Sequence, residues 1–356
     1  MGSLTSRERF RRMFEHRDAD RVPILDTPWA STIERWRREG MPEGVDYVDY
    51  FQLDRVMPVF VDNSPRYEAK VVEETERYVI QTTSWGATLK NWKHAGSVPE
   101  FLDFTIVNRD RWAEAKARMT PSRDRINWEV LERDYAKCRE RGDWILAHMW
   151  FGFDATHSWE VGTERVLMAL MTDPDWCVDM FETSLDLNTR LLDMVWDAGY
   201  EFDAVFWADD MGFKNNQFFS LDTYRALLKP IHKRAMDWAH AKGVYTHLHS
   251  CGNINPFVPE LIEIGLDALN PLEVKAGMDP VALKRQYGDR LVFHGGINAV
   301  LWSDLEALEA EMRVVVPVMK ENGGYIFASD HSVPENVGLE DFRRIADLAK
   351  ELGAYD

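Results

Sequence analysis

The sequence predicts one α/β domain over residues 1–356, a (β/α)8 TIM barrel with an N-terminal helical extension and an inserted β-hairpin at about residues 66–93. Three observations favour this fold. Eight short apolar segments have the character of strands, most of them are followed by a helix-like segment, and most of them end in a polar side chain. Short apolar strands that alternate with helices are typical of a parallel sheet, and eight such units fit a closed barrel better than an open sheet.

The first third of the chain contains the extension and the insertion. Residues 5–16 are predicted as an amphipathic helix, and residues 32–39 as another helix. Residues 67–92 alternate like antiparallel strands around a charged turn, so we interpret them as a hairpin beside the main fold. Residues 110–141 are predicted as helical with an interruption near Pro121.

The barrel units follow in regular order. The predicted strands lie near residues 22, 56, 145, 204, 245, 268, 292 and 326. The predicted helices of the second part begin near residues 163, 174, 221, 256, 280, 303 and 339. Pro174 stands at a first helical position, where its missing N–H has no cost.

The composition narrows the class of function. The chain has 60 acidic and 42 basic residues and a formal charge of −18, which argues against nucleic acid or an anionic membrane as the main partner. No apolar run is long enough to span a bilayer. The three cysteines lack the spacing of a disulfide framework, which indicates reduced thiols and a cytoplasmic location. We expect the partner to be a small molecule. A homodimer is one of the assemblies that the sequence leaves open.

The segment 247–252, HLHSCG, carries the strongest candidate site. It follows the β-prone residues 244–246. Residues i and i+2 of a strand point to the same side, with their Cα atoms about 6–7 Å apart. His249 and Cys251 therefore share a face, and an imidazole with a thiolate suits Zn²⁺. His247 lies deeper on that face. The alternative is a buried histidine and cysteine that only pack.

Polar side chains stand at nearly every predicted strand end, where a barrel of this kind places its active site. Besides His249 and Cys251, they are Asp26, Asp62, His148, Asp209, Asp210, Glu273, His294, Asp330 and His331. We assign catalytic roles to Asp209, Asp210, Asp330 and Glu273. Helix capping, loop hydrogen bonds or a solvated position are the alternatives for these carboxylates.

A third metal ligand is predicted across the barrel mouth. His331 follows the last strand and could reach the ion held by His249 and Cys251. Three protein ligands with one open position make a catalytic zinc site. Asp330, or an aspartate at 209–210, would then orient a ligand imidazole.

Cofactor binding is predicted for three further residues, His148, His294 and Trp207. For His148 and His294 the alternative is a histidine satisfied within the core. Trp207 belongs to a larger set of aromatic residues near predicted strand ends that could line an apolar pocket, with core packing as the alternative. The other aromatic members of this set are Trp29, Trp85, Trp150, Phe151, Phe153 and Phe213.

The chain resembles the uroporphyrinogen decarboxylase superfamily over nearly its whole length. The strongest motifs are residues 249–253 (HSCGN), 294–297 (HGGI) and 334–337 (PENV). Dispersed matches occur at residues 6–10, 20–23, 162–164 and 209–212, and at Pro230 and His232. The resemblance implies the barrel fold, and it implies either of two activities.

The resemblance favours the zinc-dependent corrinoid methyltransferases over the true decarboxylase. The decarboxylase grips its substrate with a motif containing Met-Arg-Gln-Ala-Gly-Arg, whereas residues 23–30 here read PILDTPWA without arginine. The methyltransferases hold zinc with His-x-Cys and a later Cys. The first pair is kept as His249 and Cys251, but His331 stands where those enzymes usually have the later cysteine.

A His/Cys/His site has one thiolate fewer than His/Cys/Cys and would be the stronger Lewis acid. This favours a methoxylated donor whose methyl passes to a corrinoid. We see no Asp-x-His-x-x-Gly segment, so we expect the corrinoid on a partner protein or free in solution. Methyl transfer from methylcobalamin to a thiol such as coenzyme M is the second methyltransferase option.

Two other classes of function stay open. One is a decarboxylase or lyase acting on a tetrapyrrole or other carboxylic acid, with Asp62, Asp209 or Asp210 as the charged catalyst. The other is a barrel that binds a small molecule without catalysis. Bound zinc would separate the methyltransferase from the lyase.

Overall fold

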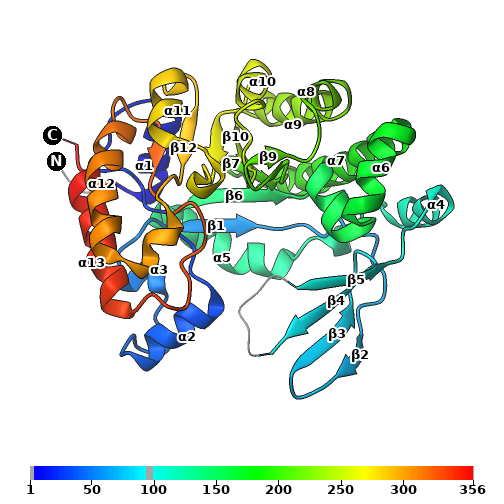
Figure 1. Cartoon of the computed structure of the whole chain (residues 1–356), viewed down its shortest axis with the longest axis horizontal. Helices are drawn as coiled ribbons and strands as arrows, with labels where there is room; N and C mark the ends of the chain where they lie inside the picture. The colour runs from blue at the N-terminus through cyan, green and yellow to red at the C-terminus, as the bar shows by residue number, and fades with distance from the viewer. Residues whose placement is uncertain (1–3, 94–98, 356) are drawn as a thin grey trace.

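A computed structural model describes residues 4–93 and 99–355 (Figure 1). Its centre is a parallel sheet of seven strands in the order β1-β6-β7-β10-β11-β12-β13. These strands are β1 Val56–Val59, β6 Trp144–Met149, β7 Ala204–Ala208, β10 Tyr245–His249, β11 Ala268–Asn270, β12 Val292–His294 and β13 Tyr325–Ile326. The curled parallel sheet and the helices around it confirm the predicted TIM-barrel-like fold.

The predicted first strand, near residue 22, is present only as an isolated bridge. Ile24 pairs in parallel with Phe327, next to β13. The N–H of Asp54, just before β1, donates to the Ile24 carbonyl at 3.2 Å. The segment therefore lies between the last and first strands of the sheet. Pro23 has no N–H to donate, which limits regular pairing there.

Helices follow most strands, as the sequence predicts. In the N-terminal half they are α1 Ser6–Phe14, α2 Ala30–Arg38, α3 Tyr47–Tyr50, α4 Arg109–Arg118, α5 Trp128–Arg141, α6 Thr163–Thr172 and α7 Pro174–Asp197. In the C-terminal half they are α8 Leu221–Thr223, α9 Lys229–Ala241, α10 Val258–Glu263, α11 Pro280–Tyr287, α12 Leu305–Met319 and α13 Leu339–Gly353. A π-helical segment, Tyr224–Leu228, joins α8 to α9, so the helix predicted from residue 221 is continuous.

Helix α1 packs against the end of the barrel where the strands begin. Thr5 and Glu8 form a capping box at its start. Phe10 and Phe14 stack on Trp144, the first residue of β6, with ring centroids 5.5 Å apart in both pairs. This aromatic contact places the helical extension below the sheet, away from the strand ends that carry the predicted site.

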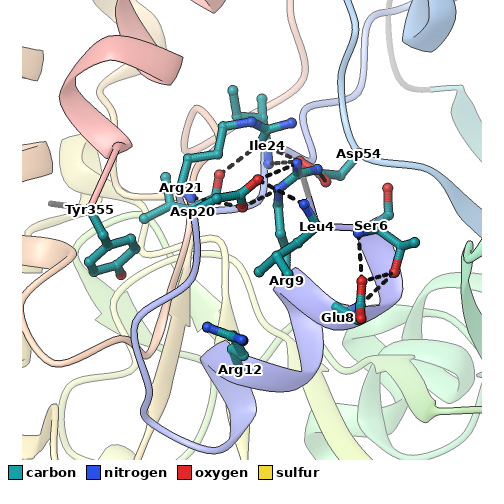
Figure 2. A network of polar contacts seen from close by, with 12 residues as sticks. Leu4, Ser6, Glu8, Arg9, Arg12, Asp20, Arg21, Ile24, Asp54 and Tyr355 are labelled. Atoms are coloured by element: carbon teal, nitrogen blue, oxygen red, sulfur yellow. Dashed lines mark hydrogen bonds and ion pairs between the residues drawn. The ribbon is translucent and has the colours of Figure 1, made fainter. Parts of the chain in front are cut away.

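A polar network fixes the same helix (Figure 2). Arg9 donates to Asp20 at 2.7 Å and to Asp54 at 2.9 Å, and Arg21 donates to Asp54 at 2.6 Å. The Asp54 carboxylate also accepts the N–H of Ile24 at 2.8 Å. The network thus joins α1, the residue 20–24 segment and the start of β1.

The insertion is larger than the predicted hairpin. It is a four-stranded antiparallel sheet made of β2 Val71–Glu74, β3 Tyr78–Thr82, β4 Ala87–Trp92 and β5 Glu100–Phe104. The alternation at residues 67–92 predicted the antiparallel pairing, but the fourth strand lies beyond it. In Figure 1 this sheet lies on the opposite side of the molecule from α12 and α13.

Two local features were not predicted. A π-helical segment, Ala155–Glu160, follows β6, and a small hairpin of β8 Gly212–Phe213 and β9 Asn216–Gln217 follows β7. Within the described residues, no helix is long and apolar enough to cross a membrane.

Candidate functional site

The carboxyl ends of the parallel strands surround a cavity of about 520 Å³. Its walls combine apolar side chains, imidazoles and a few oxygen-bearing groups. They include Leu25, Asp26, Tyr47, Asp54, Pro58, Phe60, Leu146, His148, Phe206, His249, Asn270, His294, Ser329 and His331. This is the end of the barrel where the sequence placed the site.

Three potential metal ligands meet beside this cavity: Asp210, His249 and Cys251. One ligand atom from each lies within 4.8 Å of the other two. His249 Nε2 is 3.2 Å from Cys251 Sγ and 3.7 Å from Asp210 Oδ1. All three side chains are half-buried, so the cluster is shielded from bulk water but not closed.

The register of two neighbouring strands explains this meeting. Strands β7 and β10 run parallel with Ala208 opposite His249. Asp210 follows Ala208 by two residues, as Cys251 follows His249, and the Cys251 N–H donates to Asp210 Oδ1 at 2.7 Å. Consecutive strands of a barrel usually pair, so the sequence could have indicated Asp210 as the third potential ligand, which offers an oxygen atom.

Asn270 orients the His249 ring. Its Oδ1 lies 2.5 Å from His249 Nδ1, and its Nδ2 donates to the His294 carbonyl at 3.1 Å. Because the Nδ2 amide is committed to a carbonyl, Oδ1 is the acceptor and Nδ1 carries the proton. This leaves the lone pair of Nε2 facing the cluster, as a metal ligand requires. The sequence places Glu273 at the end of this strand, but β11 ends at Asn270.

Without a cation, burial favours the protonated forms of Cys251 and Asp210. Burial, and then the charge of Asp210, raise the pKa of Cys251 well above its usual value. Burial also raises the pKa of Asp210. A bound divalent ion would reverse both effects by favouring the thiolate and the carboxylate. One imidazole, one thiol and one carboxylate are within the donor set that zinc accepts.

His331 does not join this cluster. Its side chain is exposed, and its ring stacks on Trp29 with centroids 6.3 Å apart. The preceding residue fixes the loop, because Asp330 accepts the N–H groups of Val274 and Ala299 at 2.7 Å each. Asp210, and not His331, lies within 4.8 Å of the ligand atoms of His249 and Cys251. His331 lines the same cavity as His249 but does not belong to this group.

Three residues assigned catalytic roles hold the loops instead of facing the cavity. Asp209 is fully buried, pairs with His232 at 2.8 Å and accepts the Asp154 N–H at 2.7 Å. Glu273 accepts the Gly252 N–H at 2.6 Å, next to Cys251. Asp330 ties two loops, as described above. Their oxygens accept these hydrogen bonds from the scaffold, which supports a positioning role, and the catalytic roles assigned to them stay predictions.

His148 and His294 do line the cavity. His148 lies against Phe60, with ring centroids 4.4 Å apart. His294 Nε2 donates to the Leu25 carbonyl at 2.9 Å. Burial lowers the pKa of both histidines to about 4, so they are neutral at pH 7. Their predicted role in binding stays a prediction.

Trp207 lies away from the cavity, which corrects its predicted role. It is fully buried and stacks on Phe151 with centroids 5.6 Å apart, on the helix side of β7. Phe206 faces the cavity instead, because neighbouring residues of a strand point to opposite sides. Both residues are large and apolar, so the sequence alone could not say which faced inward. Phe151 and Phe153 are likewise fully buried.

The comparisons with known proteins agree with this architecture. The model of the uroporphyrinogen decarboxylase (URO-D) family matches residues 158–352. A methyltransferase structure from Methanosarcina mazei superposes with a TM-score of 0.68 at 16% identity, over 99% of this chain and 100% of that one, and it shows the shared fold.

One curated relative is the methylcobamide:CoM methyltransferase MtaA of Methanosarcina barkeri, with 26% identity over 172 residues. The match covers 47% of this chain and 48% of that relative, about half of its length. Both relatives are named methyltransferases, which fits the branch expected from the sequence. The family match covers more than half of the chain, so the protein belongs to the uroporphyrinogen decarboxylase family.

Proposed function

We propose that this protein is a zinc-dependent methyltransferase that moves a methyl group between a small molecule and a corrinoid carried by a partner protein. The observation that supports this most is the cluster of Asp210, His249 and Cys251, whose ligand atoms lie within 4.8 Å of one another beside the cavity. The name of the relative MtaA supports the same reaction class.

The chain's own residues have distinct parts in this proposal. Asp210, His249 and Cys251 would hold the ion, and Asn270 keeps Nε2 of His249 free to bind it. The ion, when bound, would act as a Lewis acid on the atom that bears the methyl group. The cavity holds the small molecule next to His249, which belongs to both the wall and the cluster.

The donor set has one thiolate, as His/Cys/His would, but the Asp210 carboxylate adds a second negative charge. Because a carboxylate oxygen donates less electron density to zinc than a thiolate does, the ion stays a stronger Lewis acid than in His/Cys/Cys, by less than in His/Cys/His. Such a site favours methyl transfer from an oxygen, as in a methoxylated compound, over activation of a thiol. The alternative acceptor is a thiol such as coenzyme M. A lyase on a carboxylic acid and a binding barrel without turnover are the other candidates, and neither needs the metal cluster.

Metal content and single variants test the proposal. We expect about one zinc per chain by mass spectrometry in protein purified without chelator, and methyl transfer visible as a change in the spectrum of added cobalamin. His249→Ala, Cys251→Ser and Asp210→Asn should lose zinc. His331→Ala is the matched control and should retain it.

Three results would contradict the proposal or its ligand set. Wild-type protein that contains no metal, and that loses no activity on His249→Ala, would favour the lyase. Loss of zinc in His331→Ala, with zinc retained in Asp210→Asn, would restore His331 as the third ligand. Binding of small molecules without any turnover in the cobalamin assay would favour the binding barrel.

A further inference from the structure

We propose that the cavity takes an uncharged methylated compound with an apolar body, and that it discriminates against compounds bearing a sulfonate, phosphate or carboxylate. The inference rests on the proposed function and names its substrate class. Methoxylated aromatic alcohols have this chemistry, whereas coenzyme M, which carries a sulfonate, does not.

The wall of the cavity offers no cationic side chain. Across residues 4–93 and 99–355, no lysine or arginine lines it, and its formally charged groups are the carboxylates of Asp26 and Asp54. A buried anion is stable only when paired with a cation or with several hydrogen-bond donors. An anionic group in this cavity would instead face two acidic side chains.

Nearby cations are committed to other carboxylates. Arg9 and Arg21 donate to Asp54 from outside the cavity. Lys275 lies in a neighbouring hollow and is 3.2 Å from Glu273 Oε1. Recruiting one of these cations to a ligand would break an existing ion pair.

Two imidazoles of the wall, those of His148 and His294, do not supply positive charge in place of these cations. His294 Nε2 donates to the Leu25 carbonyl, and its Nδ1 lies 3.2 Å from His247 Nε2. With Nε2 as the donor, Nδ1 of His294 accepts from His247, so a neutral ring satisfies both contacts. His148 is packed between Phe60 and Phe206, with centroid distances of 4.4 and 5.2 Å.

The remaining wall suits a flat apolar body. Phe206, Leu146 and Pro58 line the interior, and Phe60 stands at the mouth with 62% of its surface exposed. A volume of about 520 Å³ is enough for a one-ring compound. A ring among these side chains would gain burial and aromatic contacts, while His249 connects the same cavity to the candidate metal cluster.

Binding to the zinc-loaded protein tests this inference independently of methyl transfer. Vanillyl alcohol and vanillate share a methoxylated ring and differ in charge. Coenzyme M, a small thiol without a ring, represents the sulfonates. By isothermal titration calorimetry we expect vanillyl alcohol to bind at least about tenfold more tightly than vanillate, with coenzyme M weaker still. Equal or tighter binding of either anion, or binding of none of the three, would overturn the inference.

A charge variant separates electrostatics from shape. Phe60→Arg places a cation at the mouth and should raise the affinity for vanillate several-fold relative to the alcohol. Val314→Arg, on α12 with 66% exposure, adds the same charge elsewhere and should change neither affinity. An unchanged ratio in Phe60→Arg would overturn the inference. Failure of methyl transfer with this binding preference intact would count against the proposed function alone.

Discussion

Asn270 Oδ1 lies 2.5 Å from Nδ1 of His249 and thereby directs Nε2 of that ring at Cys251 and Asp210. The amide comes from β11, the neighbour of the strand that carries His249, in register with it. The parallel pairing of these two strands therefore orients the His249 ring as a metal ligand would need to be oriented, by contacts within the protein alone.

The first prediction follows from this contact. Asn270→Ala should weaken zinc binding by about 10–100-fold, because the ring loses the acceptor that sets its tautomer and orientation. Competition with a chromophoric chelator measures the change. Asn216→Ala, at an exposed position of β9, is the control and should bind zinc as the wild type does. Unchanged affinity in Asn270→Ala would remove Asn270 from the site.

The second prediction concerns the buried pair of Asp209 and His232. Both side chains are fully buried, and their contact at 2.8 Å joins the end of β7 to α9. Asp209→Ala should lower the free energy of unfolding by about 3–5 kcal/mol, because it leaves the partner buried without its charge or hydrogen bond. Urea unfolding measures this.

Asp222→Ala provides the comparison for this pair. Its side chain is 94% exposed, so the substitution should change stability by less than about 0.5 kcal/mol. A similar small effect for Asp209→Ala would show that the pair does not hold the β7 end in place.

The third prediction concerns Glu160, in the π-helical segment after β6. Within the described part of the chain, neither of its carboxyl oxygens has a hydrogen-bond partner. Burial raises its pKa from 4.5 to about 8. The folded state keeps this proton between those pH values while the unfolded state loses it, so stability falls as the pH rises through this window.

Glu160→Gln should remove this dependence. The variant should match the wild type near pH 4.5 and exceed its free energy of unfolding by up to about 3 kcal/mol at pH 7. Denaturant unfolding across pH 4.5–8 measures the difference, with exposed Glu164→Gln as the control. A difference that stays constant with pH would mean that the carboxyl titrates normally.

The fourth prediction concerns the lower end of the barrel. Phe14 is 7% exposed and stacks on Trp144 and Tyr245, with centroids 5.5 and 4.7 Å apart. Phe14→Ala should cost about 3–5 kcal/mol of stability through lost burial and a cavity, without changing the zinc content of the folded protein. Phe213→Ala, with 54% exposure, is the control. Loss of zinc from folded Phe14→Ala would mean that α1 influences the metal cluster.

The sequence by itself determined the fold class, most helices, and the proximity of His249 and Cys251, although β10 ends at His249 and Cys251 lies in the loop beyond it. Periodicity carries this information, because alternation and helix-capping residues are local properties. It did not determine the size of the insertion, since the strand at residues 100–104 lies outside the alternating stretch. Nor did it show that Pro23 limits the first strand to a bridge.

Only the tertiary structure decided which distant side chains meet. The parallel register of β7 and β10 brings Asp210 to Cys251, and that of β10 and β11 brings Asn270 to His249. The contacts of Asp330 hold the last loop so that His331 lies against Trp29 instead. Register and loop anchoring depend on hydrogen bonds between segments far apart in the chain, which local sequence patterns do not encode.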